Sequence, residues 1–288
     1  MTTATSAGED TGAPLETMKR ETIDTLRERH RQEALSRGIS ARDVDVLLAD
    51  ITGKTIAWLV AHGEERIDPG ALTKMLARRY AGEPLQYIRG RTEFYSREFL
   101  VDSRVLIPRP ETEILVETAL ADLPRSARVI DVGTGSGCIA ITIERERPDL
   151  HVFAVDLSTE ALAVADINRR RHGAKVRLAA SDVLDSVRGE FDLIVSNPPY
   201  IALSEVPALE PQVRDYEPRI ALSPGPRGTE TIERIFRAAR NARVILEIGY
   251  GQENAVRGVA EALNFEIERV ISDLAGIPRI VVSSPRNG

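Results

Sequence analysis

Hydrophobic residues in the first third of the chain recur every three to four positions, a period typical of helices that bury one face. One such segment, residues 40–53, starts with Ser40 and Asp43 at the spacing of a capping box. Another starts with Asp68 and Pro69, which predicts an N-cap followed by the first helical residue. Short loops separate these segments, so the pattern predicts a small helical bundle.

The hydrophobic pattern changes to alternation near residue 84, which predicts a hairpin followed by a helix. Beyond residue 118, short apolar runs alternate with amphipathic segments in the order strand, loop, helix. The runs expected as strands cover 127–133, 150–156, 174–182, 191–197, 242–249 and, as two strands around a turn, 265–284. This order predicts a Rossmann-like α/β fold, with a seven-stranded, mostly parallel sheet, helices on both faces and an antiparallel edge strand.

These patterns divide the chain into four parts. We expect a disordered N-terminus over 1–15, a helical domain over 16–83, a hairpin linker over 84–117 and the α/β domain over 118–288. The 288 residues are enough for two domains, each with its own core.

Composition narrows the class of protein. The net charge of −6 argues against a protein that grips nucleic acid over its whole surface. No apolar run approaches the ~20 residues of a membrane-spanning helix, and the N-terminus lacks the layout of a secretion signal. The single cysteine, Cys138, fits a reducing compartment, and the four histidines are not at metal-ligand spacing. We therefore expect a cytoplasmic protein without a membrane partner or a bound metal.

A glycine-rich loop follows the first strand of the α/β part. Asp131 stands at the strand end, followed by Gly133, Gly135 and Gly137 and then by an apolar helix start. Glycines in such a loop permit positive φ and close approach of a ligand beside a helix N-terminus. The dinucleotide fingerprint would need its third glycine at position 138, which is Cys138. A carboxylate at position 131 would repel a pyrophosphate and attract a cationic ligand.

The next two strand ends add a second and a third candidate feature. Asp156 ends the second strand, where a carboxylate can accept both hydroxyls of a ribose. Ser181, Asp182 and Val183 follow the third strand, where an adenine would lie against an apolar side chain and meet polar backbone. Tight turns with solvated acidic side chains, and no ligand, would explain any one of these features. They would not readily explain all three together. Together with the glycine loop they predict a site for S-adenosylmethionine.

The tetrapeptide Asn197-Pro198-Pro199-Tyr200 follows the fourth strand and therefore faces the same crevice. An amide or arylamine nitrogen is a poor nucleophile, because its lone pair is delocalised. The side-chain oxygen of Asn197 and the carbonyl of Pro198 can hold such an NH2 group and stabilise the positive charge that develops on nitrogen. The prolines stiffen the loop and remove N–H donors, and Tyr200 offers a flat face for stacking.

The chain resembles the release-factor glutamine N5-methyltransferases, the PrmC/HemK family, over nearly its whole length. The matching pieces are PLQYIRG, VLIPRPETEILVE, DVGTGSGCIAI, SNPPYI, YEPRIAL, LEIGYGQ and DLAGIPR. The resemblance implies a class I methyltransferase domain preceded by a helical domain that helps bind the protein partner. It also implies methylation of the glutamine in the Gly-Gly-Gln loop of class-one peptide chain release factors, with S-adenosylmethionine as cofactor.

The resemblance assigns roles to individual positions. It implies that Asn197 touches both cofactor and substrate, and that Pro198, Pro199 and Tyr200 form the substrate clamp. The candidate catalytic residues are Asn197, Pro198 and Tyr200. The candidate cofactor-binding residues are Gly133, Thr134, Gly135, Ser136, Gly137, Asp156, Asp182, Val183 and Asn197.

The chain also departs from the family pattern. Val183 stands where some relatives carry an aromatic residue, which leaves an apolar shelf without a stacking ring. Ser96 replaces a usual glycine, and residues 223–230 replace a more glycine-rich run at the rim of the crevice. In the signature linker we expect three residues to brace the two domains rather than to take part in catalysis. These are Arg109, Glu111 and Glu113.

Two other functions fit parts of the pattern. An N6-adenine methyltransferase acting on DNA or RNA can share the NPPY tetrapeptide. Such an enzyme needs a basic surface to bind nucleic acid, and the net charge of −6 argues against one. A non-catalytic binding module with a degenerate site would have lost Asn197 or the glycines, and the chain has kept them. We therefore predict a glutamine methyltransferase that needs no direct contact with nucleic acid.

Overall fold

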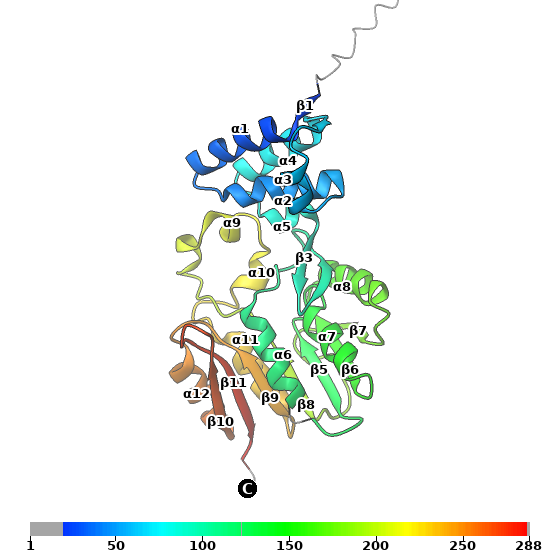
Figure 1. The fold of residues 1–288 in the computed structure, drawn as a ribbon. Helices are drawn as coiled ribbons and strands as arrows, with labels where there is room; N and C mark the ends of the chain where they lie inside the picture. The colour runs from blue at the N-terminus through cyan, green and yellow to red at the C-terminus, as the bar shows by residue number, and fades with distance from the viewer. Residues whose placement is uncertain (1–19, 122, 287–288) are drawn as a thin grey trace, which may run out of the picture. The chain divides into compact units, whose positions relative to one another are not determined.

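The structure of this protein, a computed structural model, describes residues 20–121 and 123–286 (Figure 1). The chain divides into two compact units between Ala81 and Gly82. The segment expected to be disordered, residues 1–15, lies outside the described residues. In the described part no helix has the length and apolar character needed to cross a membrane.

The first unit is built from helices that pack their apolar faces together. Leu26 of one helix, Leu47 and Leu48 of the next and Leu72 of the last are fully buried. The elements of this unit are β1 (Glu21–Thr22), α1 (Ile23–Ser36), α2 (Ala41–Thr52), α3 (Ile56–Ala61), β2 (Arg66–Ile67) and α4 (Gly70–Tyr80).

The ends of two of these helices test the capping predictions. The side chain of Ser40 accepts a hydrogen bond from the backbone N–H of Arg42 at 3.2 Å, so Ser40 caps α2 as expected. The carboxylate of Asp43, the other half of the expected capping box, pairs with Arg79 at 2.8 Å. Helix α4 begins at Gly70, one residue later than predicted, with Pro69 as its N-cap residue. Asp68 still contributes, because its Oδ1 accepts a hydrogen bond from the Gly70 N–H at 2.8 Å.

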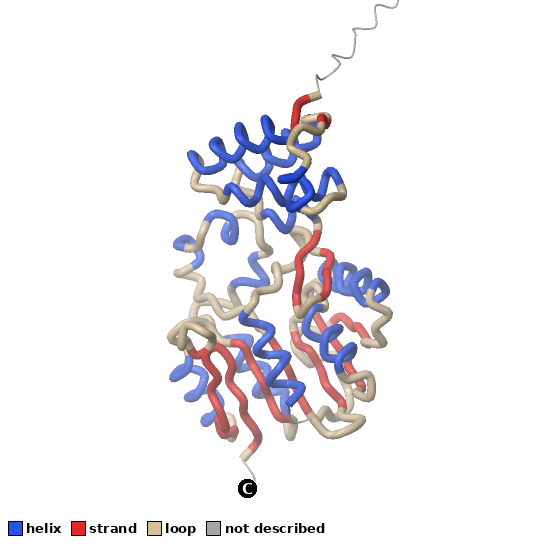
Figure 2. The backbone as a smooth tube through the Cα atoms, viewed as in Figure 1, coloured by secondary structure: helices blue, strands red, loops and turns tan. Residues whose placement is uncertain are grey.

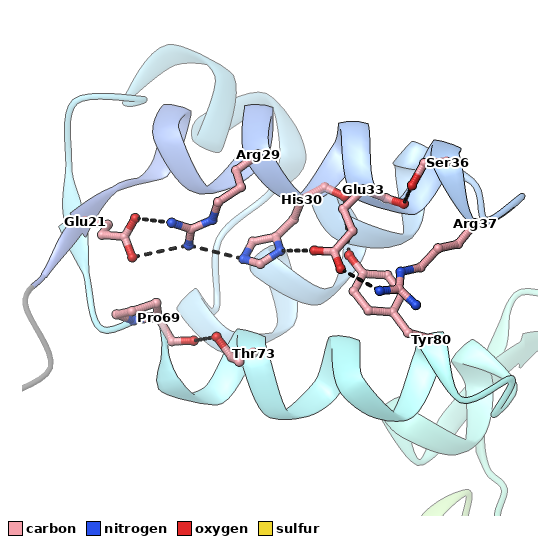
Figure 3. Close-up of polar contacts among 9 residues, drawn as sticks. All are labelled: Glu21, Arg29, His30, Glu33, Ser36, Arg37, Pro69, Thr73 and Tyr80. Atoms are coloured by element: carbon pink, nitrogen blue, oxygen red, sulfur yellow. Dashed lines mark hydrogen bonds and ion pairs between the residues drawn. The ribbon is translucent and has the colours of Figure 1, made fainter.

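Polar side chains along α1 form a connected row (Figure 3). Arg29 pairs with Glu21 at 2.7 Å and approaches Nε2 of His30 at 3.3 Å. A guanidinium has only donors, so Nε2 must accept and the His30 ring is neutral. Burial lowers the pKa of His30, which favours the same neutral form. Farther along, the guanidinium of Arg37 lies 4.7 Å from the ring centre of Tyr80 and so joins α1 to α4.

The second unit starts with a hairpin that packs into its core. Phe94 and Phe99 are buried in one cluster with Leu115 and Val129, so the hairpin belongs to this unit. Ser96 in its turn has φ 58°, a conformation that glycine adopts without steric cost, which explains why glycine is usual there. The elements of this region are α5 (Leu85–Arg89), β3 (Arg91–Phe94), β4 (Arg97–Leu100) and α6 (Glu111–Ala121).

The main sheet has seven strands in the order β10-β11-β9-β8-β5-β6-β7. The pairs from β9 to β7 are parallel, and β11 runs antiparallel to both β9 and β10. This confirms the predicted mostly parallel sheet with an antiparallel edge. The strands are β5 (Arg128–Val132), β6 (His151–Asp156), β7 (Arg177–Ala180), β8 (Leu193–Ser196), β9 (Arg243–Glu247), β10 (Phe265–Ser272) and β11 (Pro278–Pro285).

Helices cover both faces of this sheet (Figure 2). Because side chains alternate along a strand, Val129 packs with α6 and α7 on one face and Ile130 packs with α11 and α12 on the other. The helices are α7 (Cys138–Glu146), α8 (Thr159–Arg171), α11 (Glu230–Ala239) and α12 (Glu253–Ala262), with the short η1 (Val206–Ala208), α9 (Pro211–Arg214) and α10 (Arg219–Leu222) between β8 and α11.

Candidate active site

The carboxyl ends of β5, β6 and β8 and the loop after β7 open onto one pocket. Most of the residues predicted from the sequence line it. They are Gly133, Thr134, Gly135, Ser136, Asp156, Asp182, Val183, Asn197, Pro198 and Pro199. Of the candidate cofactor- and substrate-binding residues, Gly137 and Tyr200 do not line it. The strand order therefore brings together side chains that lie far apart in the sequence, at the edge where open α/β sheets bind ligands.

The glycine loop presents bare backbone to this pocket. Gly133 has φ 74° and Gly135 has φ 54°, and a Cβ atom built on either would meet nothing within 4 Å. Gly137 has a different role, because a Cβ there would come within 2.9 Å of Ile141 Cδ1 and 3.3 Å of Ala165 Cβ. The first two glycines leave room for a ligand, whereas the third allows α7 and α8 to pack closely.

Asp131 supports the loop from behind. It is fully buried and does not line the pocket, and its Oδ2 accepts a hydrogen bond from Thr134 Oγ1 at 2.6 Å. The attraction of a cationic ligand expected from Asp131 would therefore act across the loop and not by direct contact, and it stays a prediction. Burial raises the pKa of this carboxyl to about 7. Asp131 fixes the position of Thr134, which does line the pocket.

Asp156 both lines the pocket and holds two backbone segments. Its Oδ2 accepts from the Gly135 N–H and its Oδ1 accepts from the Ser158 N–H, each at 2.9 Å. Each carboxylate oxygen has a second lone pair, so both can still accept a hydrogen bond from a ligand hydroxyl. Burial raises the pKa of Asp156, and the two backbone hydrogen bonds oppose that shift.

Beyond β7 the pocket wall is a turn with an unusual backbone. Val183 is buried and has φ 52°, a rare conformation for a β-branched residue. Its side chain packs with Val132 and Val155, so the shelf here is apolar and aliphatic. Asp182 pairs with Arg234 of α11 at 2.7 Å, and Arg234 also lines the pocket.

The NPPY segment leaves β8 beside α6. Nδ2 of Asn197 donates to Oγ1 of Thr112 at 3.1 Å, and Thr112 Oγ1 donates to Oε2 of Glu247 at 2.7 Å. The single proton of the Thr112 hydroxyl is used by Glu247, so its oxygen must accept from the Asn197 NH2 group. The oxygen of the Asn197 amide consequently lies on the other side of the planar group, away from Thr112.

Tyr200 lies behind the pocket wall rather than on it. Its ring is close to Gly249, where a Cβ would come 3.0 Å from Tyr200 Cδ2, and its phenol lies near Glu247, whose pKa it lowers. The backbone carbonyl of Tyr200 accepts from Gln252 Nε2 at 2.7 Å. Burial raises the pKa of the phenol. The expected stacking of a substrate on this ring stays a prediction.

The signature linker residues make contacts inside the second unit. Nη2 of Arg109 lies 2.7 and 2.8 Å from the two carboxylate oxygens of Glu217, whose side chain is almost completely buried. Oε1 of Glu113 accepts from the Tyr95 N–H at 2.7 Å and so holds the hairpin turn. For these two residues the bracing expected between the two domains is found within the second unit.

The run 223–230 packs against the NPPY segment. Gly228 has φ 77°, and a Cβ there would come 2.5 Å from the backbone oxygen of Tyr200. Ser223 and Pro224 line the pocket. The run therefore keeps a glycine where the close approach requires one, and its other residues shape the rim.

Several pocket residues were not found from the sequence. They come from the stretch before α6, from α6 itself, from α10 and from α11, and they are Arg104, Leu106, Pro108, Thr112, Ile220 and Arg234. The motifs VLIPRPETE and YEPRIAL cover most of these positions, but their residue types indicate no particular chemistry. Asn168 was also missed. It is fully buried, and its Nδ2 donates to the Ser136 carbonyl at 2.9 Å, which ties α8 to the glycine loop.

Comparison with known proteins agrees with this geometry. The family model described as the methyltransferase small domain matches residues 110–209, and that of the PrmC N-terminal domain matches residues 21–90. A solved methyltransferase from Pyrococcus furiosus shares the fold, with a TM-score of 0.52 and 17% identity over 75% of this chain and 100% of that one.

Curated relatives are similar over most of the chain. The release factor glutamine methyltransferase of Koribacter versatilis is 43% identical over 239 residues, which cover 78% of this chain and 84% of the relative. That of Cereibacter sphaeroides is 43% identical over 252 residues, covering 84% of this chain and 90% of the relative. The family predicted from the motifs is thus confirmed, and the chain belongs to the release factor glutamine methyltransferase family.

Proposed function

We propose that this protein transfers a methyl group from S-adenosylmethionine to the side-chain amide nitrogen, N5, of the glutamine in the Gly-Gly-Gln motif of class-one peptide chain release factors. The observation that carries this proposal is the orientation of the Asn197 amide. Its nitrogen is held by Thr112, so an acceptor oxygen is available beside the glycine-loop pocket. Membership of the family supports the same reaction.

The residues present fit S-adenosylmethionine. Gly133 and Gly135 face open space and let a ligand approach the backbone, and Asp156 keeps lone pairs for ribose hydroxyls. Val183 supplies an aliphatic surface for an adenine, and Asp182 lies beside it. S-adenosylmethionine, when bound, supplies an electrophilic methyl group on a positively charged sulfur.

The acceptor amide is oriented by groups that only accept hydrogen bonds. The Asn197 side-chain oxygen and the Pro198 carbonyl can each take one N–H of the glutamine NH2, which aims the nitrogen lone pair at the methyl group. Pro198 and Pro199 have no backbone N–H to compete. As the new N–C bond forms, the methyl–sulfur bond would break and S-adenosylhomocysteine would leave. Positive charge develops on nitrogen, and the two oxygens stabilise it until a proton is lost to solvent.

The proposal extends to partners and location. The helical unit, expected over 16–83, would bind the release factor. The 84–117 segment, expected as a linker, packs with the second unit and leads into the methyltransferase domain expected over 118–288. The single cysteine, Cys138, is buried and free, which supports a location in the reducing cytoplasm.

A methyl-transfer assay with labelled S-adenosylmethionine tests the proposal. The substrates are a purified class-one release factor, its Gly-Gly-Gln variant with glutamine changed to alanine, and DNA and RNA. Label on the native factor and none on the variant is the expected result. Label on DNA or RNA instead would establish the adenine reaction and overturn the proposal.

A further inference from the structure

The buried carboxylate of Glu247 contacts Thr112, and Thr112 in turn holds Asn197 of the NPPY segment. Glu247 ends β9 and is 2% exposed. Its Oε2 accepts the hydroxyl proton of Thr112 at 2.7 Å, and the phenol of Tyr200 is a neighbour that lowers its pKa. Burying an ionised carboxylate costs free energy, because the charge loses its hydration. A buried Glu247 beside the pocket therefore needs a structural or functional explanation.

The direction of the hydrogen bonds provides that reason. An ionised carboxylate can only accept, so the Thr112 hydroxyl must donate to Glu247. The Thr112 oxygen is then an acceptor, and it takes the NH2 side of the Asn197 amide at 3.1 Å. Each bond in the row fixes the direction of the next one. The last consequence is that the NH2 group of Asn197 is used by Thr112, and its oxygen is left as the acceptor for a ligand in the pocket that Asn197 lines.

Protonation of Glu247 would remove this constraint. A neutral carboxyl group can donate to Thr112, whose own proton is then free to point at Asn197. The amide would be favoured in the reversed orientation, with its oxygen toward Thr112 and its NH2 group toward the pocket. Two NH2 groups would then face each other, and the glutamine amide would lose an acceptor.

We propose that ionised Glu247 is a positioning residue which, through the hydroxyl of Thr112, holds the Asn197 amide with its oxygen toward the substrate. This inference rests on the role proposed above for Asn197. It assigns to Thr112 and Glu247 a task that neither performs by touching the substrate. It also predicts that the reaction depends on the charge state of a residue behind the pocket wall.

The groups around Glu247 place its ionisation near neutral pH. Burial and the charge of Glu111 on α6 raise its pKa, whereas Arg279 on β11 and the hydrogen bonds from Thr112 and Tyr200 lower it. The balance leaves the pKa at about 7. The orientation of Asn197 should therefore respond to pH in the range where the enzyme can be assayed.

The test compares variants that differ in one hydroxyl. Thr112→Val removes the link, and Thr112→Ser retains it. Thr118→Val is the matched control, because Thr118 lies on the same helix and its hydroxyl donates to the Ile114 carbonyl at 2.7 Å, away from the pocket. For each protein, kcat on the release factor is measured from pH 5.5 to 9, and the Kd for S-adenosylmethionine is measured separately.

The wild type should lose kcat as the pH falls through about 7. Thr112→Val should lower kcat about tenfold at pH 8, the effect of one lost buried hydrogen bond. It should also abolish the loss of kcat at acidic pH. Thr112→Ser should keep the loss of kcat at acidic pH, and Thr118→Val should behave as the wild type. A Thr112→Val enzyme with wild-type kcat and pH profile would overturn the inference. A wild type that methylates no release factor at any pH would instead refute the proposed function.

A second measurement does not depend on turnover. NMR of the wild type should show the Asn197 side-chain NH2 signals moving with pH at the same midpoint as the Glu247 carboxyl carbon. In Thr112→Val the Asn197 signals should no longer follow that titration. Asn197 signals that are independent of pH in the wild type would overturn the inference, even in an active enzyme.

Discussion

The carboxylate of Asp156 accepts a hydrogen bond from the backbone N–H of Gly135 at 2.9 Å, so the residue that ends β6 holds the loop that follows β5. Its other oxygen accepts from the Ser158 N–H at the start of α8. One side chain thus fixes the shape of the glycine loop and still presents lone pairs to the pocket. Loop shape and ligand binding are therefore expected to fail together when this carboxylate is altered.

Asp156→Asn should weaken binding of S-adenosylmethionine by about tenfold or more, because charge-assisted hydrogen bonds are roughly twice as strong as neutral ones. Isothermal titration calorimetry with S-adenosylmethionine and S-adenosylhomocysteine measures the effect. Asp166→Asn is the control, since Asp166 on α8 pairs with Arg169 and Arg170 of its own helix. Equal affinities for the two variants would remove Asp156 from cofactor binding.

Gly137→Ala should destabilise the fold more than Gly173→Ala. Both glycines have positive φ, 82° and 62°, so both substitutions carry the cost of a left-handed residue, about 1–2 kcal/mol. At Gly137 the new Cβ also meets Ile141 Cδ1 at 2.9 Å, whereas at Gly173 it meets nothing within 4 Å. The difference in free energy of unfolding should be about 1–3 kcal/mol, the usual cost of overpacking. Urea unfolding measures it, and equal losses would contradict the packing role.

The contrast between the glycines shows what the sequence could and could not predict. The loop was predicted from the spacing of its glycines, but spacing does not separate a glycine that faces a ligand from one that faces a helix. The charge of Asp131 indicates an attraction for a cationic ligand, but it does not indicate that the carboxylate is fully buried and bonded to Thr134. Local pattern identified the strands and their ends, because those depend on neighbouring residues.

Contacts between distant segments were beyond the reach of local pattern. Thr112 and Glu247 are 135 positions apart, and neither residue type alone indicates a site. Arg234 lies on α11, where its position in an amphipathic helix suggests only a solvated side chain. Its pairing with Asp182 depends on how α11 packs beside the loop after β7. The sequence therefore identified the residues at the strand ends but not those that support them.

Asp131→Asn should flatten the decline of stability with rising pH. Burial raises the pKa of Asp131 from 3.8 to about 7, so the folded state retains a proton that the unfolded state loses. The corresponding stabilisation is complete below about pH 4 and is lost as the pH rises to about 7, at no more than ~1.4 kcal/mol per pH unit. Urea unfolding at pH 5 and pH 7 measures the slope, and Glu247 contributes a remaining part in the same direction. An unchanged slope in the variant would show that Asp131 is already ionised in the folded protein.

Asn197→Ala should leave the fold intact and lower turnover by about 10²–10³, the usual effect of losing one aligned polar group in an active site. The loss should fall on kcat, because the Asn197 oxygen is proposed to act on the nitrogen as its charge develops. Asn241→Ala is the matched control: Asn241 is exposed and precedes β9, at the end of the sheet opposite the pocket, and should keep wild-type turnover. Thermal unfolding of both variants checks the fold. Wild-type turnover in Asn197→Ala would leave the Pro198 carbonyl to orient the glutamine amide alone, and would end the argument that Thr112 and Glu247 serve catalysis through Asn197.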